Sequence, residues 1–319
     1  MSNAPERDRE EMRRFLVDTD TAADDPVALV MALRRPDVRL EAVTVVAGNV
    51  PVDQGVQNAL YTLELLGKKH VPVFRGAEAP LLAPLRTSQF IHGEDGMGDI
   101  GLSLRGREPH PGHAVDALLE AVGCYPGEVE LVTLGPLTNV AMALHKDPSF
   151  AGKVKECVMM GGASDHLGNM TPVAEFNVWV DPEAAKVVFS SGMPLKMVGL
   201  DVSRKHAVFT PEESAKLRDV GTPPAEFCVD IQKVVHTEWD GGFELPDAIA
   251  MAVALDPAVA TRTARRFVAV ETGGEWSRGQ TVVDHHETTI MGEHEPNVEV
   301  VEEASRERFL ELLYEAVRP

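Results

Sequence analysis

Apolar and polar positions alternate along the chain in blocks that predict strands followed by helices. The block "RFLVDTD" at 14–20 is typical of a buried strand, and "DPVALVMALRR" after it is typical of a helix with Pro26 in its first turn. Further strands are expected at 40–49, 71–76, 129–135, 154–162 and 194–202. Helices are expected at 54–67, 114–123, 138–145, 182–191, 211–237 and 247–255, and residues 281–317 should form short strands and a closing helix.

Strands that are apolar throughout and alternate with helices favour one fold class. The pattern predicts an α/β fold with an open, mostly parallel central sheet and helices on both faces. Ligands of such sheets bind beyond the carboxyl ends of the strands. The length of 319 residues, 44% of them apolar, suits a single domain over 15–319, and the polar residues 1–14 are expected to form a flexible extension.

The charge balance narrows the range of partners. A net charge of −20 repels nucleic acid and anionic membrane surfaces, so neither is expected as a partner. The sequence contains no run of about 18 apolar residues that could span a bilayer, and its charged N-terminus does not resemble a signal peptide, so a cytoplasmic protein is expected. Cys124, Cys157 and Cys228 lack the CxxC spacing of a zinc site and indicate no disulfide framework.

The stretch "FLVDTDTAADDP" at 15–26 holds four aspartates, at positions 18, 20, 24 and 25. Like charges this close repel each other, at a cost on the order of a kcal/mol per pair. Aspartates at a helix start can cap its amides, which would explain one or two of them. A hard cation held by carboxylate oxygens explains all four, and Ca²⁺ and Mg²⁺ are the candidates.

Two enzyme families share parts of this stretch. "DTDT" fits the DxDxT signature of haloacid-dehalogenase-like phosphatases, which use Mg²⁺ and an aspartate nucleophile. The longer "DTDTAADDPVALVMAL" resembles the N-terminal signature of the nucleoside hydrolases. The remaining motifs follow in the order of the second family: "TVVAGN", "HGEDGMGD", "TLGPLTNVAMAL", "MGGA", "AEFNVWVDPEAA" and "LPDAIAMAVALDP". This resemblance covers about residues 15 to 300.

The resemblance implies a Rossmann-like core, a bound Ca²⁺, a ribonucleoside substrate and a homodimer or homotetramer. It implies hydrolysis of the N-glycosidic bond, of purine or pyrimidine nucleosides, with Asp20 as the general base. The implied ligands of the ion are the side chains of Asp20, Asp25 and Asp247 and the carbonyl of Leu134. The implied sugar-binding residues are Asp24, Asn49, Asn169, Glu175, Phe176 and Asn177, and His92 should lie near the base.

The sequence departs from the resemblance at Pro246. Nucleoside hydrolases that accept purines and pyrimidines have a histidine there, which donates a proton to the leaving base, and proline cannot do so. His236, Glu238, Trp239 and Glu244 are candidate replacements, and Trp239 could stack on a base. Three alternatives to a nucleoside hydrolase stay open: a hydrolase of a ribosyl compound with an easy leaving group, a phosphatase, and a ribose-binding protein without turnover.

Three further patterns are weaker indications. "GMGDIG" at 96–101 satisfies GxGxxG but neither follows a strand nor opens a helix, so a dinucleotide site is not expected. "HPGH" and "DHHE" lack the helical spacing of a HExxH zinc site and are interpreted as local structural features.

Overall fold

The fold was taken from a computed structural model, which describes residues 12–165, 167–238, 242–286 and 294–319. Its central sheet has eight strands in the order β3-β2-β1-β4-β5-β6-β12-β9. All neighbouring pairs are parallel except β12 and β9, which are antiparallel. The expected mostly parallel α/β sheet is therefore confirmed, and its order from β3 to β6 is that of the Rossmann-like doubly wound folds.

The strands of the main sheet are β1 (Arg13–Thr19), β2 (Val38–Val45), β3 (Val73–Arg75), β4 (Val129–Thr133), β5 (Glu156–Met160), β6 (Leu195–Val198), β9 (Ala260–Arg266) and β12 (Val298–Ala304). Two small sheets pair β7 (Val208–Phe209) with β8 (Phe243–Glu244) and β10 (Val268–Val270) with β11 (Thr281–Val283).

The helices in the first half of the chain are α1 (Asp25–Arg34), α2 (Val52–Leu65), α3 (Gln89–His92), α4 (Ala114–Cys124), α5 (Thr138–Lys146) and α6 (Phe150–Lys153). Those in the second half are α7 (Phe176–Val180), α8 (Pro182–Phe189), α9 (Leu200–His206), α10 (Pro211–Arg218), α11 (Pro223–Asp230), α12 (Lys233–Glu238), α13 (Pro246–Leu255) and α14 (Arg306–Val317). A 3-10 turn covers Pro257–Val259.

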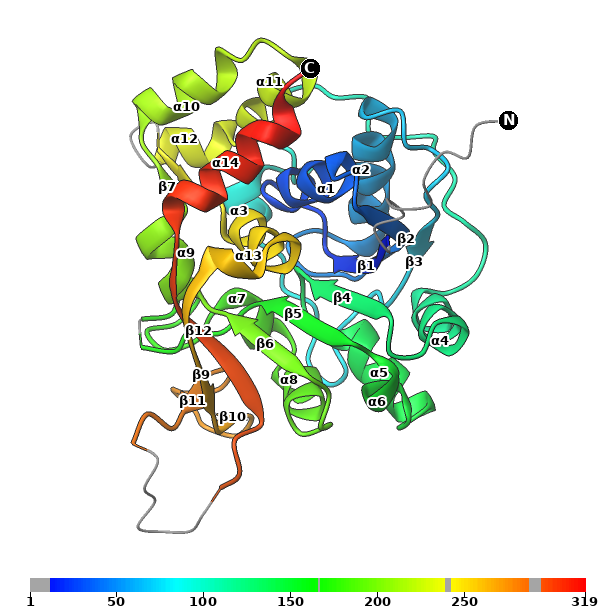
Figure 1. The fold of residues 1–319 in the computed structure, drawn as a ribbon, viewed down its shortest axis with the longest axis vertical. Helices are drawn as coiled ribbons and strands as arrows, with labels where there is room; N and C mark the ends of the chain where they lie inside the picture. The colour runs from blue at the N-terminus through cyan, green and yellow to red at the C-terminus, as the bar shows by residue number, and fades with distance from the viewer. Residues whose placement is uncertain (1–11, 166, 239–241, 287–293) are drawn as a thin grey trace, which may run out of the picture.

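Successive residues of β1 enter opposite hydrophobic layers. Phe15 and Val17 join the apolar cluster formed with α1, α13 and α14, whereas Leu16 joins the cluster formed with α4, α5 and α8. Figure 1 shows these two groups of helices on opposite sides of the sheet. Because helices cover both faces of the sheet, each central strand is apolar on both sides. This is why polar and apolar residues do not alternate in the sequence of these strands.

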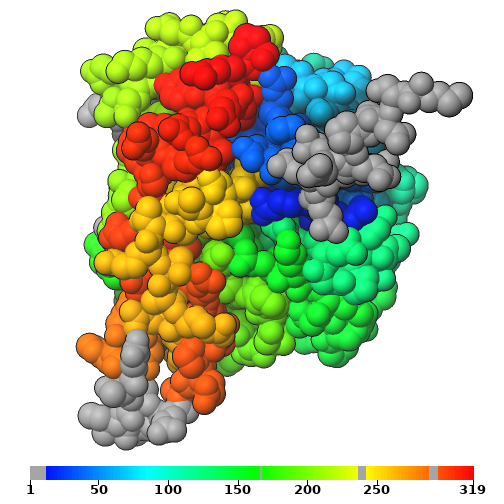
Figure 2. Space-filling view, in the orientation of Figure 1, coloured from blue at the N-terminus to red at the C-terminus, as the bar shows by residue number. Residues whose placement is uncertain are grey.

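The space-filling view shows the first half of the chain and its C-terminal third side by side on one face of the molecule. In Figure 2 the first half, blue to green, lies on one side and the C-terminal third, yellow to red, lies on the other. Helix α13 packs against α1, β5, α9 and α14, so the two halves are joined through the centre of the fold. Among the described residues, no helix has the length and apolar character needed to cross a membrane.

The structure corrects one expected strand. The segment 194–202 was expected to be extended throughout, but β6 ends at Val198 and helix α9 begins at Leu200. Gly199 is the extended residue before the helix, and the Leu200 N–H is held by the carbonyl of Gly162 at 2.9 Å. The strands β9 and β10 and the short helices α3, α6 and α7 were not expected, and β1 begins at Arg13.

Arg13 fastens the start of β1 to the end of α13. Its guanidinium donates to the carbonyl of Leu255 at 2.8 Å and to that of Ala254 at 2.7 Å. It also forms an ion pair with Glu130, whose side chain is 9% exposed. The last carbonyls of a helix have no partner inside that helix, and here a cationic side chain satisfies them.

We expect Arg13→Ala to lower the free energy of unfolding by about 1–3 kcal/mol, because it leaves buried carbonyls and Glu130 without this partner. Urea denaturation measures the change. Arg39→Ala is the matched control, since Arg39 is 59% exposed and pairs with Glu41 at the surface, and its cost should stay within about 0.5 kcal/mol. Equal losses in the two variants would contradict the role of Arg13.

Candidate active site

The carboxyl ends of β1, β2, β4 and β5 converge on one pocket of about 100 Å³. The strand order reverses between β1 and β4, and this is where doubly wound sheets bind their ligands. The pocket is lined by Asp24, Asn49, Ser88, Ile91, His92, Leu134, Met160, Asn169, Glu175, Phe176, Asn177, Pro246 and Asp247. Nine of these lining residues are ones that the sequence analysis singled out as site residues.

The remaining predicted site residues fall into three groups. Asp20 and Asp25 are fully buried and are not among the residues that line the pocket. Trp239 lies outside the described residues, and His236 and Glu238 belong to α12, although their side chains are not described. Glu244 lies on β8, away from the pocket lining, and its carboxylate accepts the Ser203 hydroxyl.

The loop that carries the aspartates has an unusual backbone. Thr21 and Ala23 have positive φ angles of 39° and 45°, a region that side chains other than glycine rarely adopt. Two contacts hold the loop there: the Ala23 N–H donates to the carbonyl of Gly96 at 2.7 Å, and the Asn58 amide donates to that of Thr21 at 2.8 Å. The Asn58 amide also donates to the backbone carbonyl of Asp95 at 2.9 Å, so this buried side chain joins two loops of the site.

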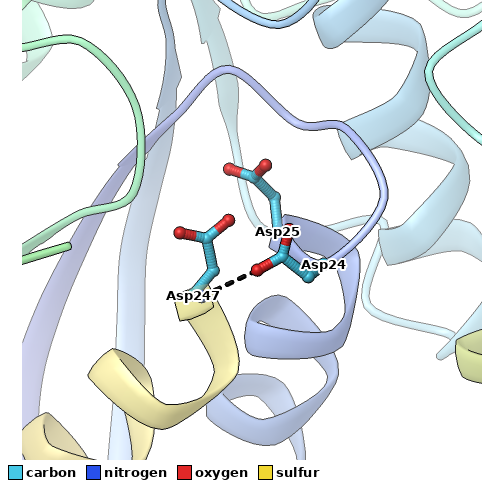
Figure 3. A group of neighbouring side chains, drawn as sticks. All are labelled: Asp24, Asp25 and Asp247. Carbon is cyan, nitrogen blue, oxygen red and sulfur yellow. Dashed lines mark hydrogen bonds between the residues drawn. The ribbon is translucent and has the colours of Figure 1, made fainter. Parts of the chain in front are cut away.

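Three carboxylates lie close enough to share one cation. Asp24 and Asp25 come from the start of α1 and Asp247 from the start of α13, and each offers an oxygen within 4.8 Å of the others. Figure 3 shows the three side chains gathered between the two helix ends, with the Asp247 N–H donating to Asp24 Oδ2 at 2.7 Å. This group shares Asp25 and Asp247 with the predicted ligand set and has Asp24 in addition.

Burial and mutual repulsion make these carboxylates hard to ionise. Burial, with a contribution from Asp25, raises the pKa of Asp24 to about 8, and burial raises that of Asp25 to about 6. The pKa of Asp247 lies well above its usual value through burial and the charges of Asp24, Asp25 and Asp20.

The donor set suits a hard cation. Among the described residues, no lysine or arginine forms an ion pair with Asp20, Asp24, Asp25 or Asp247. Oxygen donors that lack a cationic partner fit an ion such as Ca²⁺ or Mg²⁺, which would remove the repulsion.

Asp20 is held from several sides. Its Oδ2 accepts the Asn49 N–H at 2.6 Å, and its Oδ1 accepts the Asn49 side-chain amide at 3.2 Å. Burial and the charge of Asp25 raise the pKa of Asp20 well above its usual value. Gly48 and Gly135 pack against it, and a methyl group on Gly48 would lie 2.0 Å from Asp20 Oδ2. Only glycine leaves room for this carboxylate.

The predicted carbonyl ligand lies at the end of β4. The Leu134 N–H donates to the carbonyl of Asp18 at 2.8 Å, which continues the pairing of β1 with β4. The Leu134 carbonyl accepts the Asn177 amide at 2.8 Å. A carbonyl oxygen has two lone pairs, so this hydrogen bond leaves one free for a cation.

One side of the pocket is built on α7. Glu175 is the residue before this helix, and its carboxylate accepts the N–H groups of Gly162 at 2.8 Å, Asn177 at 2.8 Å and Val178 at 3.2 Å. Burial raises its pKa to about 7. Asn177 Oδ1 is buried and has no hydrogen-bond partner among the described residues. A buried acceptor without a partner is costly, and a ligand hydroxyl would satisfy it.

His92 and Pro246 are two further residues of the pocket lining. His92 is half-buried, its Nδ1 has no hydrogen-bond partner among the described residues, and burial lowers its pKa to about 4. The imidazole is therefore neutral at pH 7. Pro246 is the first residue of α13 and lines the pocket directly beside Asp247. Neither residue supplies an acidic proton at neutral pH.

Sequence analysis did not single out Ser88, Ile91, Met160 or Asn58. Ile91 precedes His92 in "IHGEDG", and Met160 ends the strand before "GGA", so both could have been found as neighbours of marked residues. Asn58 interrupts the apolar face of α2, which was an available signal. Ser88 gave none, since a serine in a polar loop has no distinctive pattern.

The weaker patterns have structural roles where they are described. Glycines 96, 98 and 101 all have positive φ angles in irregular backbone, as the lack of a strand and helix around "GMGDIG" predicted. His113 caps α4 by accepting the Val115 N–H at 3.2 Å, and His285 contacts the carbonyl of Ser164 at 2.9 Å.

The fold and the site define a class: a doubly wound α/β protein with an acidic, cation-compatible ligand pocket at the point where its strand order reverses. The model of the inosine-uridine preferring nucleoside hydrolases matches residues 15–311, and the chain belongs to this family. It is therefore a glycosidase-type hydrolase of ribonucleosides from a metal-dependent family. The resemblance found in the sequence is confirmed, and the phosphatase alternative is wrong.

Relatives match over most of the chain. The pyrimidine-specific ribonucleoside hydrolase RihA of Salmonella paratyphi C is 36% identical over 310 residues, which cover 95% of this chain and 98% of that protein. The inosine-uridine preferring nucleoside hydrolase of Leishmania major is 39% identical over 278 residues, 85% of this chain and 88% of that protein. A solved plant nucleoside hydrolase, PpNRh1, is 31% identical with a TM-score of 0.91, covering 97% of this chain and 100% of that one.

We expect Gly48→Ala to lower kcat/KM by about 100-fold, because the added methyl group displaces the Asp20 carboxylate and misplacements near 1 Å have that effect. Steady-state assays with a ribonucleoside measure the loss. Gly123→Ala is the control: Gly123 lies in α4 with open space around its Cβ position, and the change should leave activity intact. Full activity of Gly48→Ala would show that Asp20 tolerates displacement.

Proposed function

We propose that this protein hydrolyses the N-glycosidic bond of ribonucleosides to ribose and free base with Ca²⁺ as its cofactor and Asp20 as the general base. One observation carries the proposal. Four buried aspartates that lack cationic partners among the described residues lie beside a pocket lined by Asn49, Glu175 and Asn177. This combination suits a cation and a polyhydroxyl ligand together.

In the proposed reaction a water molecule adds to the anomeric carbon while the bond to the base nitrogen breaks. Asp20 takes a proton from that water, and the base leaves with the electron pair of the broken bond. When bound, the cation would lower the pKa of the water. Carboxylates around the pocket favour the positive charge that develops on the sugar ring.

The residues divide into a metal side and a sugar side. Asp20, Asp25, Asp247 and the Leu134 carbonyl are the proposed ligands of Ca²⁺. Asp24, Asn49, Asn169, Glu175, Phe176 and Asn177 are proposed to bind the ribose, with the Asn177 Oδ1 free to accept a hydroxyl. His92 is proposed to contact the base. A homodimer or homotetramer is the proposed assembly.

The lining residues discussed above include no proton donor for the leaving base. Because Pro246 and the neutral His92 provide no acidic proton, substrates whose base leaves without protonation are favoured. A ribosyl compound with an easy leaving group is therefore the second candidate substrate.

Incubation with a panel of ribonucleosides should release reducing sugar and free base. We expect Asp20→Asn to lower kcat by about 100- to 10,000-fold, the range of a lost general base. Asp53→Asn is the control, since Asp53 is 78% exposed and pairs with Arg75 at the surface. Near-normal turnover by Asp20→Asn would exclude the base role, and ribose binding without turnover of any ribosyl compound would favour a binding protein.

Chelation with EGTA should lower both activity and the melting temperature, because it leaves the buried carboxylates without a counter-charge. Added Ca²⁺ should restore both. Mg²⁺ should restore less, since it requires tighter octahedral geometry and gives up water reluctantly. Equal recovery with Mg²⁺, or a melting temperature that does not respond to EGTA, would contradict a Ca²⁺ site.

A further inference from the structure

Ser88 is a buried pocket residue whose hydroxyl bonds a side chain outside its own helix. It precedes α3, in the position where serine side chains commonly cap a helix, but its hydroxyl makes no capping bond. The hydroxyl donates instead to Asn49 Oδ1, and the Ser88 N–H donates to the Asn49 carbonyl at 3.0 Å. Only 2% of the surface of Ser88 is exposed, so the residue is buried beside Asn49.

The Ser88 hydroxyl and the Asp20 carboxylate together set which way the Asn49 side-chain amide faces. An amide that accepts a hydroxyl at its oxygen presents its N–H₂ group on the other side. That group lies 3.2 Å from Asp20 Oδ1, and the Asn49 backbone N–H lies 2.6 Å from Oδ2. The reversed amide would set an oxygen against the Asp20 carboxylate and leave the Ser88 hydroxyl facing an N–H₂ group.

We propose that Ser88 is a positioning residue for hydrolysis, which holds the Asn49 side chain so that its N–H₂ group donates to Asp20. The inference rests on the proposed role of Asp20 as the general base. Among the described residues, the Ser88 hydroxyl forms no hydrogen bond with Asp20 or the expected metal ligands, and it acts through Asn49. Since Ser88 begins the segment that carries Ile91 and His92, the same contacts also fix the base side of the pocket relative to Asp20.

A different role is possible for a residue that lines the pocket: Ser88 could bind the substrate directly. The two roles predict different kinetics. A positioning residue that acts through Asn49 lowers kcat because Asp20 loses a donor, and its effects on kcat and KM both vanish once Asn49 is gone. A residue that binds substrate changes KM, and its effect persists without Asn49.

The experiment is a double-mutant cycle with Ser88→Ala, Asn49→Ala and the double variant, assayed with the ribonucleoside that the wild-type protein cleaves best. We expect Ser88→Ala to lower kcat about tenfold, the effect of weakening one hydrogen bond to a charged group, and we expect any change in KM to arise through Asn49. In the Asn49→Ala background the same change should have no further effect. Ser191→Ala is the control, because its hydroxyl bonds the Val188 carbonyl at a helix end outside the pocket lining.

Ser88→Thr keeps the hydroxyl and should retain most of the turnover, which separates loss of the hydrogen bond from damage to the fold. Wild-type kcat in Ser88→Ala, a change confined to KM, or an equal loss with and without Asn49 would each overturn the inference while leaving the proposed hydrolysis intact. A wild-type protein that cleaves no ribonucleoside would overturn the proposed function itself, and this role with it.

Discussion

Repulsion among buried carboxylates is the constraint on which the rest of this site depends. Asp20, Asp24, Asp25 and Asp247 are all at most 6% exposed, and burial raises the pKa of each. The charges of neighbouring aspartates raise the pKa values of Asp20, Asp24 and Asp247 further. Backbone donors and the Thr19 hydroxyl satisfy some of their oxygens but supply no counter-charge. The folded chain therefore holds these carboxylates in an energetically unfavourable arrangement, whose repulsion a cation would remove. The positive φ angles at Thr21 and Ala23 add backbone strain to this arrangement.

The fold keeps these charges together by packing elements that are distant in sequence. Asp24 and Asp25 start α1, Asp247 starts α13 more than 200 residues later, and the two helices pack against each other. At its far end α13 is tied to β1 by Arg13. The spacing of Asp24, Asp25 and Asp247 is consequently set by two packed helix starts, as a site that must tolerate repulsion requires. The loop that carries Asp20 is held in place by its contacts with Gly96 and Asn58. Ser88 and Asn49 extend this rigidity to Asp20.

The sequence predicted the parts of the structure that follow from local pattern. Apolar strands alternating with helices indicated a parallel sheet, which the structure confirms. Polar residues at strand ends indicated the side of the sheet at which the pocket lies. Ser88 and Asn58 could not be assigned in this way, because their roles come from contacts with Asn49 and Thr21, which tertiary packing creates. The strand expected at 194–202 failed for a related reason: the apolar run continues through Leu200 and Val202, but Gly199 starts a new helix.

The two halves of the pocket differ in how strongly their side chains constrain the substrate. On the proposed sugar side, Glu175 accepts three N–H groups, and Asn177 Oδ1 has no hydrogen-bond partner among the described residues, which favours a hydroxyl-rich ligand. On the proposed base side, Ile91, Pro246 and a neutral His92 line the pocket and provide no acidic proton. Relatives of comparable identity are named as pyrimidine-specific in one case and inosine-uridine preferring in another, so overall identity does not determine the base. In the proposed reaction, a base that carries positive charge before cleavage would leave as a neutral molecule with no proton required, so discrimination between substrates would depend on how readily each base departs.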